Sequence, residues 1–274
     1  MAKMFKGFNR DMTCTPAKGV KFQYEEGKTY ETETAALCKN GFHACEMPLC
    51  CFSYYPPAGS VYHEVDLEEV SKEHEGYSKH VGKKITIGAR LDVAGLIKAQ
   101  FEWVKEQTKN EYSGGYWSAL TGGNESALTG GNLSALTGGD RSALMGGYGS
   151  ALTGGYGSAL IGGNESALTG GYGSALTGGN RSALMGGERS ALTGGNRSAL
   201  IGGELSALTG GSASVLRGGE GSWFCGGLWS VFACEIINEL GNIVGMAIAV
   251  VDGEKIKPGV WYRVKNGEFV EVDE

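Results

Sequence analysis

The residues best suited to metal chemistry lie in one short segment near the N-terminus. The thiol and imidazole side chains of this segment are Cys38, His43, Cys45 and Cys50, and Cys51 follows directly. Thiolate and imidazole are ligands that zinc prefers, so a metal site is one interpretation. The spacings C-x6-C and C-x4-CC differ from the usual CxxC knuckle and favour buried or reduced thiols. We therefore expect no cofactor, with metal binding as the alternative.

A second set of residues has the types needed for transferase chemistry. His43, Tyr54 or Tyr55, and Glu64 follow one another in an order that resembles the order of nucleotide-contacting residues in ADP-ribosyltransferases, and Tyr55 is the tyrosine that we select. The resemblance implies nucleotide handling, provided that the three side chains converge within hydrogen-bond reach. The same residue types are common in packing and surface roles. We expect a non-enzymatic protein, with an N-terminal nucleotide-handling or metal-dependent enzyme as the alternative.

A strict octapeptide repeat occupies residues 114–227. The unit is GGxxSALT, and it occurs fourteen times without an insertion. Ser-Ala-Leu-Thr alternates, so Ser and Leu share one face of a short strand while Ala and Thr share the other. We expect Ser and Leu to point inward, because only that face carries a large apolar residue. We expect the Gly pair to supply positive φ at the corner.

Two octads are needed for one turn of a closed coil. Eight residues with one corner cannot enclose a core, whereas sixteen residues provide two strands and two corners. Stacked coils bury the leucines that a single short strand leaves exposed. The repeat therefore predicts a β-solenoid of about seven coils, roughly 34 Å long at about 4.8 Å per coil. In this register Glu125 stacks on Arg141, and Glu165 stacks on Arg181.

The corners of the coil carry the candidate binding surface. Tyr156 stacks on Tyr172 in the sixteen-residue register, and stacked tyrosines offer rigid contact area at low entropy cost. Simple corner packing is the alternative. The predicted binding residues are the tyrosines and arginines of the corners, namely Tyr148, Tyr156, Tyr172, Arg181, Arg189 and Arg197.

The flanking regions are ordinary mixed sequence. Residues 1–113 predict a small α/β domain that ends in a helix from Val93 to about Lys109, and we expect this helix to cap the first coil. Residues 228–274 predict strands and a hairpin at Asn266-Gly267, after aromatic residues such as Trp229 that plug the last coil. The fold class is thus mainly β, with a solenoid between an N-terminal α/β domain and a β-rich C-terminal cap.

Composition limits the partners and the compartment. Net charge is only −6, and basic residues do not dominate any region, so nucleic-acid binding is not expected. No stretch approaches the roughly 20 apolar residues of a membrane helix, so no membrane partner is expected. Seven cysteines, an odd number, together with a start that does not resemble a signal peptide, predict reduced thiols in the cytoplasm.

The octads resemble those of bacterial ice-nucleation proteins, for example GGNESALT at 122–129. Those proteins form β-solenoids of sixteen-residue coils, so the resemblance implies the same architecture. It also implies an alternative function, the binding of ice or ordered water by a row of threonines. The row is interrupted in this chain by Met145, Ile161, Met185 and Arg217, among others.

The whole chain resembles a group of uncharacterised proteins encoded by phages, prophages and gut bacteria. The resemblance rests on Lys6-Gly7-Phe8, on residues 27–30, on the GFHxCxxPL motif at 41–49 and on residues 251–270. It implies a phage-like origin. We therefore expect a protein-binding or scaffold protein whose partner is a host or defence factor, and we expect that the chain can form a homodimer.

Overall fold

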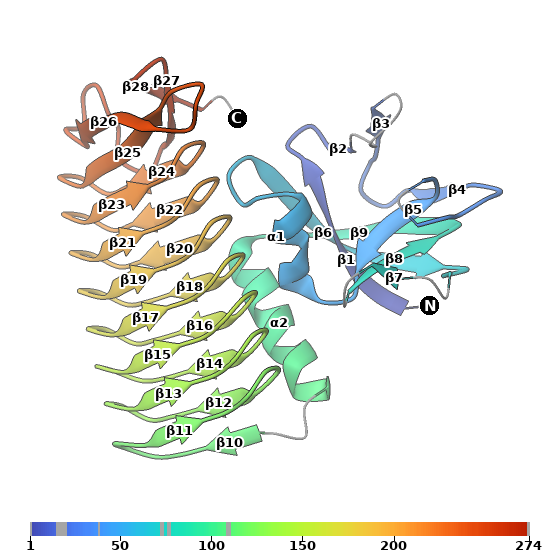
Figure 1. The fold of residues 1–274 in the computed structure, drawn as a ribbon, viewed down its shortest axis with the longest axis horizontal. Coiled ribbons are helices and arrows are strands. Elements are labelled where there is room, and N and C mark those ends of the chain that lie inside the picture. The colour runs from blue at the N-terminus through green and yellow to red at the C-terminus, as the bar shows by residue number, and fades with distance from the viewer. Residues whose placement is uncertain are drawn as a thin grey trace. The chain divides into compact units, whose positions relative to one another are not determined.

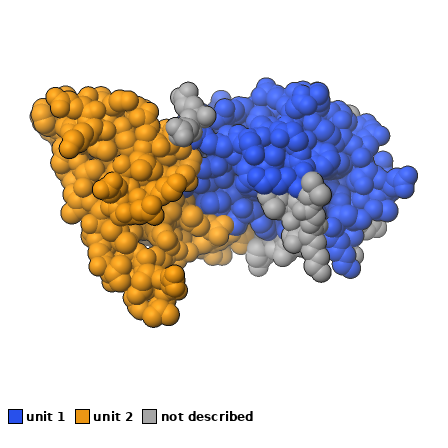
Figure 2. Space-filling view, turned by 90° about the horizontal axis from the view of Figure 1, so that it is seen from above, with its two compact units in different colours: residues 1–103 blue, residues 104–274 orange. Residues whose placement is uncertain are grey.

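The computed structural model of the chain describes residues 2–14, 21–37, 39–71, 74–75, 78–107 and 111–272. The chain divides into two compact units, Met1–Trp103 and Val104–Glu274 (Figure 2). The metal and catalytic candidates belong to the first unit, and the repeat belongs to the second.

An antiparallel sheet of seven strands forms the first unit (Figure 1). Alternate residues of its central strands, including Phe8, Val65 and Ile87, are buried in one apolar core. The sheet order is β4-β9-β6-β1-β5-β8-β7, with bounds β1 (Ala2–Asn9), β4 (Thr29–Glu31), β5 (Phe42–Cys45), β6 (Ser60–Glu68), β7 (His74–Glu75), β8 (Lys79–Gly82) and β9 (Lys84–Leu91). A separate pair joins β2 (Thr13–Cys14) to β3 (Phe22–Gln23). Strands therefore dominate the expected α/β domain.

Two α-helices lie in the described part of the chain, and the longer one begins at Val93 as the sequence predicts. A 3-10 turn, η1 (Pro48–Cys50), leads into α1 (Cys51–Tyr54), with Pro48 at its first position. The longer helix is α2 (Val93–Gln107). The Asp92 carboxylate accepts a hydrogen bond from the Gly95 N–H at 2.7 Å and caps α2. The capping of the first coil by this helix stays a prediction.

The second unit is a β-solenoid with sixteen-residue coils, which confirms the predicted register. Parallel pairing joins identical positions of successive coils, as between Ala127 and Ala143. One sheet contains β10 (Glu111–Ser113), β12 (Ala127–Thr129), β14 (Ala143–Met145), β16 (Ala159–Ile161), β18 (Ala175–Thr177), β20 (Ala191–Gly194), β22 (Ala207–Gly210) and β24 (Trp223–Gly226). The other contains β11 (Ala119–Thr121), β13 (Ala135–Thr137), β15 (Ala151–Thr153), β17 (Ala167–Thr169), β19 (Ala183–Met185), β21 (Ala199–Ile201), β23 (Val215–Gly218) and β25 (Val231–Ile237).

The stack is one coil longer than the repeat. β10 pairs with β12 although residues 111–113 precede the first octad, and Tyr112 stands opposite Leu128. At the other end β25 pairs with β23, and Phe232 stands opposite Leu216. Backbone pairing and an apolar side chain at the Leu position are enough to extend a coil, so the solenoid continues where the sequence no longer repeats.

The interior of the solenoid is a leucine column lined by serines, as predicted. The column runs from Leu128 to Leu216 and continues with Phe224 and Phe232, all almost completely buried. From Ser134 onward, the serine hydroxyls of the column connect neighbouring coils. The Ser182 Oγ, for example, donates to a glycine carbonyl at 3.2 Å and accepts the N–H of the serine sixteen residues earlier at 3.3 Å. The buried hydroxyls and amides are thereby satisfied.

The glycine pairs have a different role from the predicted one. Positive φ occurs at the residue directly before each serine, such as Glu165 at 59° and Arg181 at 58°, and not at the pair. The first glycine of each pair lies against the serine of its own octad, and a Cβ at Gly170 would lie 2.7 Å from the Ser174 Cβ. The prediction of positive φ at the pair was wrong, because close approach of the serine, rather than backbone conformation, requires glycine there.

Antiparallel strands close the C-terminal end of both sheets. β26 (Ile243–Val250) pairs with β25, whereas β27 (Trp261–Lys265) pairs with β24 and with β28 (Glu268–Glu271). The turn at Asn266-Gly267 has positive φ at both residues, as predicted. Phe224 and Phe232 fill the last coils, but Trp229 is 64% exposed. Its predicted core position was wrong, because the sixteen-residue register continues and places Trp229 in a corner turn.

Candidate functional site

Among the described residues, the structure does not bring the predicted metal ligands together. Cys45 is buried on β5, His43 lies on the same strand, and Cys50 ends η1 with its Sγ 3.6 Å from the Met47 sulfur. Cys38 lies outside the described residues. Within the described ranges, no group of three or more His, Cys, Asp or Glu side chains is placed to hold a metal ion.

The three catalytic candidates lie on different elements. His43 is on β5 and Glu64 is on β6, and β1 runs between these strands. Two strand spacings amount to about 9.6 Å, and Phe5 of β1 pairs directly with Glu64. Tyr55 follows α1 and packs over Gly7, where an added Cβ would lie 2.6 Å from the Tyr55 Cβ. His43 and Glu64 are therefore not on neighbouring strands, and a catalytic role for the three stays a prediction.

The first unit buries Lys6, for which the sequence predicts no chemical role. Lys6 is only 7% exposed, and its Nζ donates to the His43 carbonyl at 2.7 Å. The ammonium lies 5.4 Å from the Phe8 ring centroid and 5.7 Å from that of Tyr24. Burial lowers the pKa of the Lys6 amine below its ordinary value. The alternation of Met4, Lys6 and Phe8 in a strand is the signal that places this lysine on the core face.

The predicted binding surface is divided between two opposite edges of the solenoid. The edge formed by the turns that lead from the first sheet to the second, which we name the asparagine edge, contains residues 116–117, 132–133, 148–149, 164–165, 180–181, 196–197, 212–213 and 228–229. The other, which we name the acidic edge, contains residues 124–125, 140–141, 156–157, 172–173, 188–189, 204–205 and 220–221. Tyr148, Arg181 and Arg197 lie on the asparagine edge. Tyr156, Tyr172 and Arg189 lie on the acidic edge.

The two edges differ in charge. The acidic edge carries five acids and two arginines, a net charge of −3: Glu125, Asp140, Glu188, Glu204 and Glu220 against Arg141 and Arg189. The asparagine edge carries one acid and two arginines, a net charge of +1: Glu165 against Arg181 and Arg197. The near-neutral repeat is therefore polarised across its width, and its two edges suit different partners.

The acidic edge presents the predicted tyrosine stack. The rings of Tyr156 and Tyr172 are 5.6 Å apart and almost parallel, with an interplanar angle of 5°. The guanidinium of Arg189 lies 6.0 Å from the Tyr172 ring centroid, within the range of a cation–π contact. On the same edge Arg141 pairs with Glu125 at 3.4 Å, as the register predicts.

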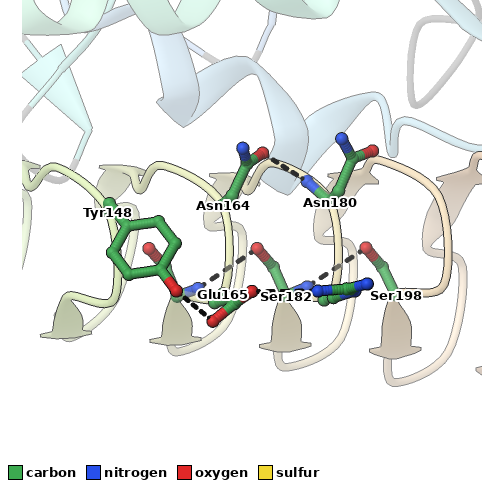
Figure 3. A network of polar contacts seen from close by, with 8 residues as sticks. Tyr148, Asn164, Glu165, Asn180, Ser182 and Ser198 are labelled. Carbon is green, nitrogen blue, oxygen red and sulfur yellow. Dashed lines mark hydrogen bonds and ion pairs between the residues drawn. The ribbon is translucent and has the colours of Figure 1, made fainter.

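A polar network connects three coils of the asparagine edge (Figure 3). The Tyr148 hydroxyl donates to the Glu165 carboxylate, and Arg181 pairs with the same carboxylate at 3.2 Å. The hydrogen bond from Tyr148, followed by that from Arg181, holds the pKa of Glu165 below its ordinary value. Glu165 is thus ionised and engaged, whereas Arg197, one coil further on, has no ion-pair partner among the described residues.

A ladder of asparagine amides runs beside this network. The Oδ1 atoms of Asn164, Asn180 and Asn196 each accept the backbone N–H of the turn residue one coil further, all at 2.8 Å. A backbone N–H can only donate, so each amide must present its oxygen to the ladder and its NH₂ outward. Figure 3 shows this orientation for Asn164 and Asn180. The three NH₂ groups have no partner among the described residues and remain available as donors.

These groups line a groove of about 530 Å³ along the asparagine edge. Tyr148 stands at one end and Trp229 at the other, with Arg181, Arg197 and the asparagine ladder between them. The predicted surface included Tyr148 and both arginines but not Trp229. The sixteen-residue register, continued beyond the repeat, predicts Trp229 on this edge, because position 229 lies two coils after Arg197.

Comparison with known proteins adds a relationship for the first unit. Residues 2–99 match the model of a family described as a domain of unknown function (DUF7666). Searches of the curated proteins and of the solved structures found no match. Among the described residues, no helix is both long and apolar enough to cross a membrane. The N-terminal region is therefore similar to an uncharacterised family, and the solenoid lies outside the matched residues.

Proposed function

We propose that the chain is a non-enzymatic scaffold whose solenoid is a rigid platform for a protein partner. The observation that supports this proposal is where the octads differ from one another. The inward Ser and Leu and the Gly pair recur from coil to coil, whereas the two corner positions hold Tyr, Trp, Asn, Asp, Glu, Arg, Leu, Ser, Ala or Gly. The chemical variety of the repeat is therefore concentrated along the two edges, where specific recognition would reside.

The fold supports this role because it fixes the corner residues before a partner arrives. Each coil pairs with the next through its backbone, and the asparagine ladder and the serine column add hydrogen bonds between coils. Side chains on a rigid frame lose little conformational entropy on binding, so more of the contact energy appears as affinity. The stacked Tyr156 and Tyr172 are an example of such a preorganised surface.

The kind of partner follows from the resemblance to proteins of phages, prophages and gut bacteria. A chain of phage-like origin acts on the components of its host, so a host or defence protein is the partner that we propose. None of the described cysteines forms a disulfide, which supports action in a reducing cytoplasm. The match of residues 2–99 to a domain of unknown function leaves this role open to direct test.

Site-specific photo-crosslinking in cells that express the chain tests the proposal. The photoreactive phenylalanine analogue benzoylphenylalanine replaces Tyr148 on one edge or Tyr156 on the other, and Thr153, exposed on a sheet face, serves as the control position. We expect a discrete protein adduct from at least one edge position and none from Thr153. No adduct from either edge, or equal adducts from all three positions, would contradict the proposal.

A further inference from the structure

The groove on the asparagine edge has the chemistry of an acceptor-binding site. Its uncommitted amide and guanidinium groups are all donors: the outward NH₂ groups of Asn164, Asn180 and Asn196 and the guanidinium of Arg197. The single carboxylate of the groove, Glu165, is already engaged by Tyr148 and Arg181. A ligand that brings carboxylates and carbonyl oxygens would therefore satisfy the groove, whereas a ligand rich in donors or cations would meet few acceptors beyond this engaged carboxylate and the Ser212 hydroxyl.

The shape of the groove favours an extended ligand. The donors recur once per coil, at steps of about 4.8 Å, in a line parallel to the solenoid axis. Trp229, 64% exposed, ends this line with a flat apolar surface. An extended peptide rises about 3.3 Å per residue and offers a backbone carbonyl at each step, so several of its acceptors can lie within reach of this row of donors.

The charge of the groove selects among extended ligands. The asparagine edge has a net charge of +1, enough to attract carboxylates through Arg197 but far below the dense cationic surface that a nucleic acid requires. The acidic edge, at −3, repels polyanions. We infer that the groove between Tyr148 and Trp229 binds an extended acidic segment of the protein partner, with a carboxylate on Arg197 and the chain along the asparagine amides.

Two matched substitutions isolate the donor row. Asn180→Asp keeps an Oδ1 that accepts the Asn196 N–H but replaces the NH₂ donor with a charged acceptor. Asp140 shows that an aspartate supports this ladder bond, since its Oδ1 accepts the Tyr156 N–H at 2.9 Å. The control is Asn124→Asp, which makes the same chemical change at the same ladder position of the acidic edge, where Asn124 accepts the Asp140 N–H.

Binding of a dye-labelled hexaglutamate peptide to the full chain, followed by fluorescence anisotropy at low and physiological salt, provides the test. We expect salt-sensitive binding that weakens about tenfold or more in Asn180→Asp and in Arg197→Gln, since each change removes a hydrogen bond to a charged group. Asn124→Asp and Arg189→Gln should stay within about twofold of the unchanged chain, because they alter the acidic edge.

Several outcomes would overturn the inference. They are an absence of hexaglutamate binding, equal losses in the Asn180→Asp and Asn124→Asp variants, or tighter binding of hexalysine, of oligothymidylate or of a neutral glucan oligomer. The inference rests on the proposed platform function, but the crosslinking and peptide-binding experiments distinguish the failure of one from the failure of the other. A crosslinked partner without hexaglutamate binding would retain the platform and reject the acidic segment. Hexaglutamate binding without any crosslinked protein would retain the groove and reject the protein partner.

Discussion

Removing one buried hydroxyl, by Ser214→Ala, tests whether the serine column stabilises the solenoid through hydrogen bonds. The Ser214 Oγ donates to the Gly195 carbonyl at 3.1 Å and accepts the Ser198 N–H, also at 3.1 Å. The Gly195 carbonyl keeps a second partner, the Gly211 N–H at 3.2 Å. The Ser198 N–H has no other partner among the described residues, and Ser198 is 1% exposed. The substitution therefore leaves one buried amide unsatisfied.

The expected loss of stability follows from this one unsatisfied amide. A buried donor without a partner costs about 1–3 kcal/mol, whereas replacing a hydroxyl by hydrogen leaves almost no cavity. We expect Ser214→Ala to lower the free energy of unfolding by about 2 kcal/mol, in urea denaturation of the full chain. We also expect faster hydrogen exchange at the Ser198 amide, which reports the local opening of that coil.

The control for this experiment lies two residues earlier. Ser212 is exposed in the adjacent corner, and only its backbone N–H takes part in the asparagine ladder. Ser212→Ala should therefore change the free energy of unfolding by less than about 0.5 kcal/mol. If Ser214→Ala were equally neutral and the Ser198 amide stayed protected, serine would be required at this position only for its small size. The hydrogen-bonded column would then not be a source of stability.

Two further changes test the cores of the two units. Leu176→Ala should lower the free energy of unfolding by about 2–5 kcal/mol in urea denaturation, because Leu176 is fully buried. The control, Ile201→Ala, should lower it clearly less, because Ile201 is 40% exposed. Equal losses would refute the inward leucine column. Burial lowers the pKa of Lys6 in the folded chain below the 10.5 of an ordinary lysine. The unfolded chain therefore binds the proton first, and stability should fall as pH drops from about 10.5 toward the folded pKa. Lys6→Met should raise stability at neutral pH and remove this dependence, and an unchanged pH profile of unfolding would contradict the lowered pKa of the buried Lys6 amine.

The solenoid was predictable because its signal repeats. Fourteen copies of GGxxSALT define an inward Ser and Leu, and closure of a core requires two octads per coil. The stacking of Tyr156 on Tyr172 and the pairing of Glu165 with Arg181 follow from the register alone. The role of the glycine pair was not predictable in this way. Glycine can be required by a positive φ or by close packing, and the two cases differ in where the Ser174 side chain lies relative to Gly170. The spacing of residues in the sequence does not give that position.

The candidate groove was only partly predictable for a related reason. Residue type selects Tyr148, Arg181 and Arg197, and the sixteen-residue register places them on the edge opposite Tyr156 and Tyr172. Trp229 was assigned to the core because large aromatic residues are usually buried, whereas its corner position leaves it 64% exposed. Residue type indicates what a side chain can do, and only the register continued beyond the repeat indicates which neighbours it has.

Alternation and spacing along the chain specify its local and periodic features: the strands, the sixteen-residue coil, the buried leucines, the turn at Asn266-Gly267 and the two rows of corner residues. These features can be read from the order of the residues alone. Only the folded structure reveals the outward NH₂ groups of the asparagines and the burial of Lys6 between Phe8 and Tyr24. Those features depend on contacts between coils and between strands distant in sequence, and such contacts exist only once the chain has folded.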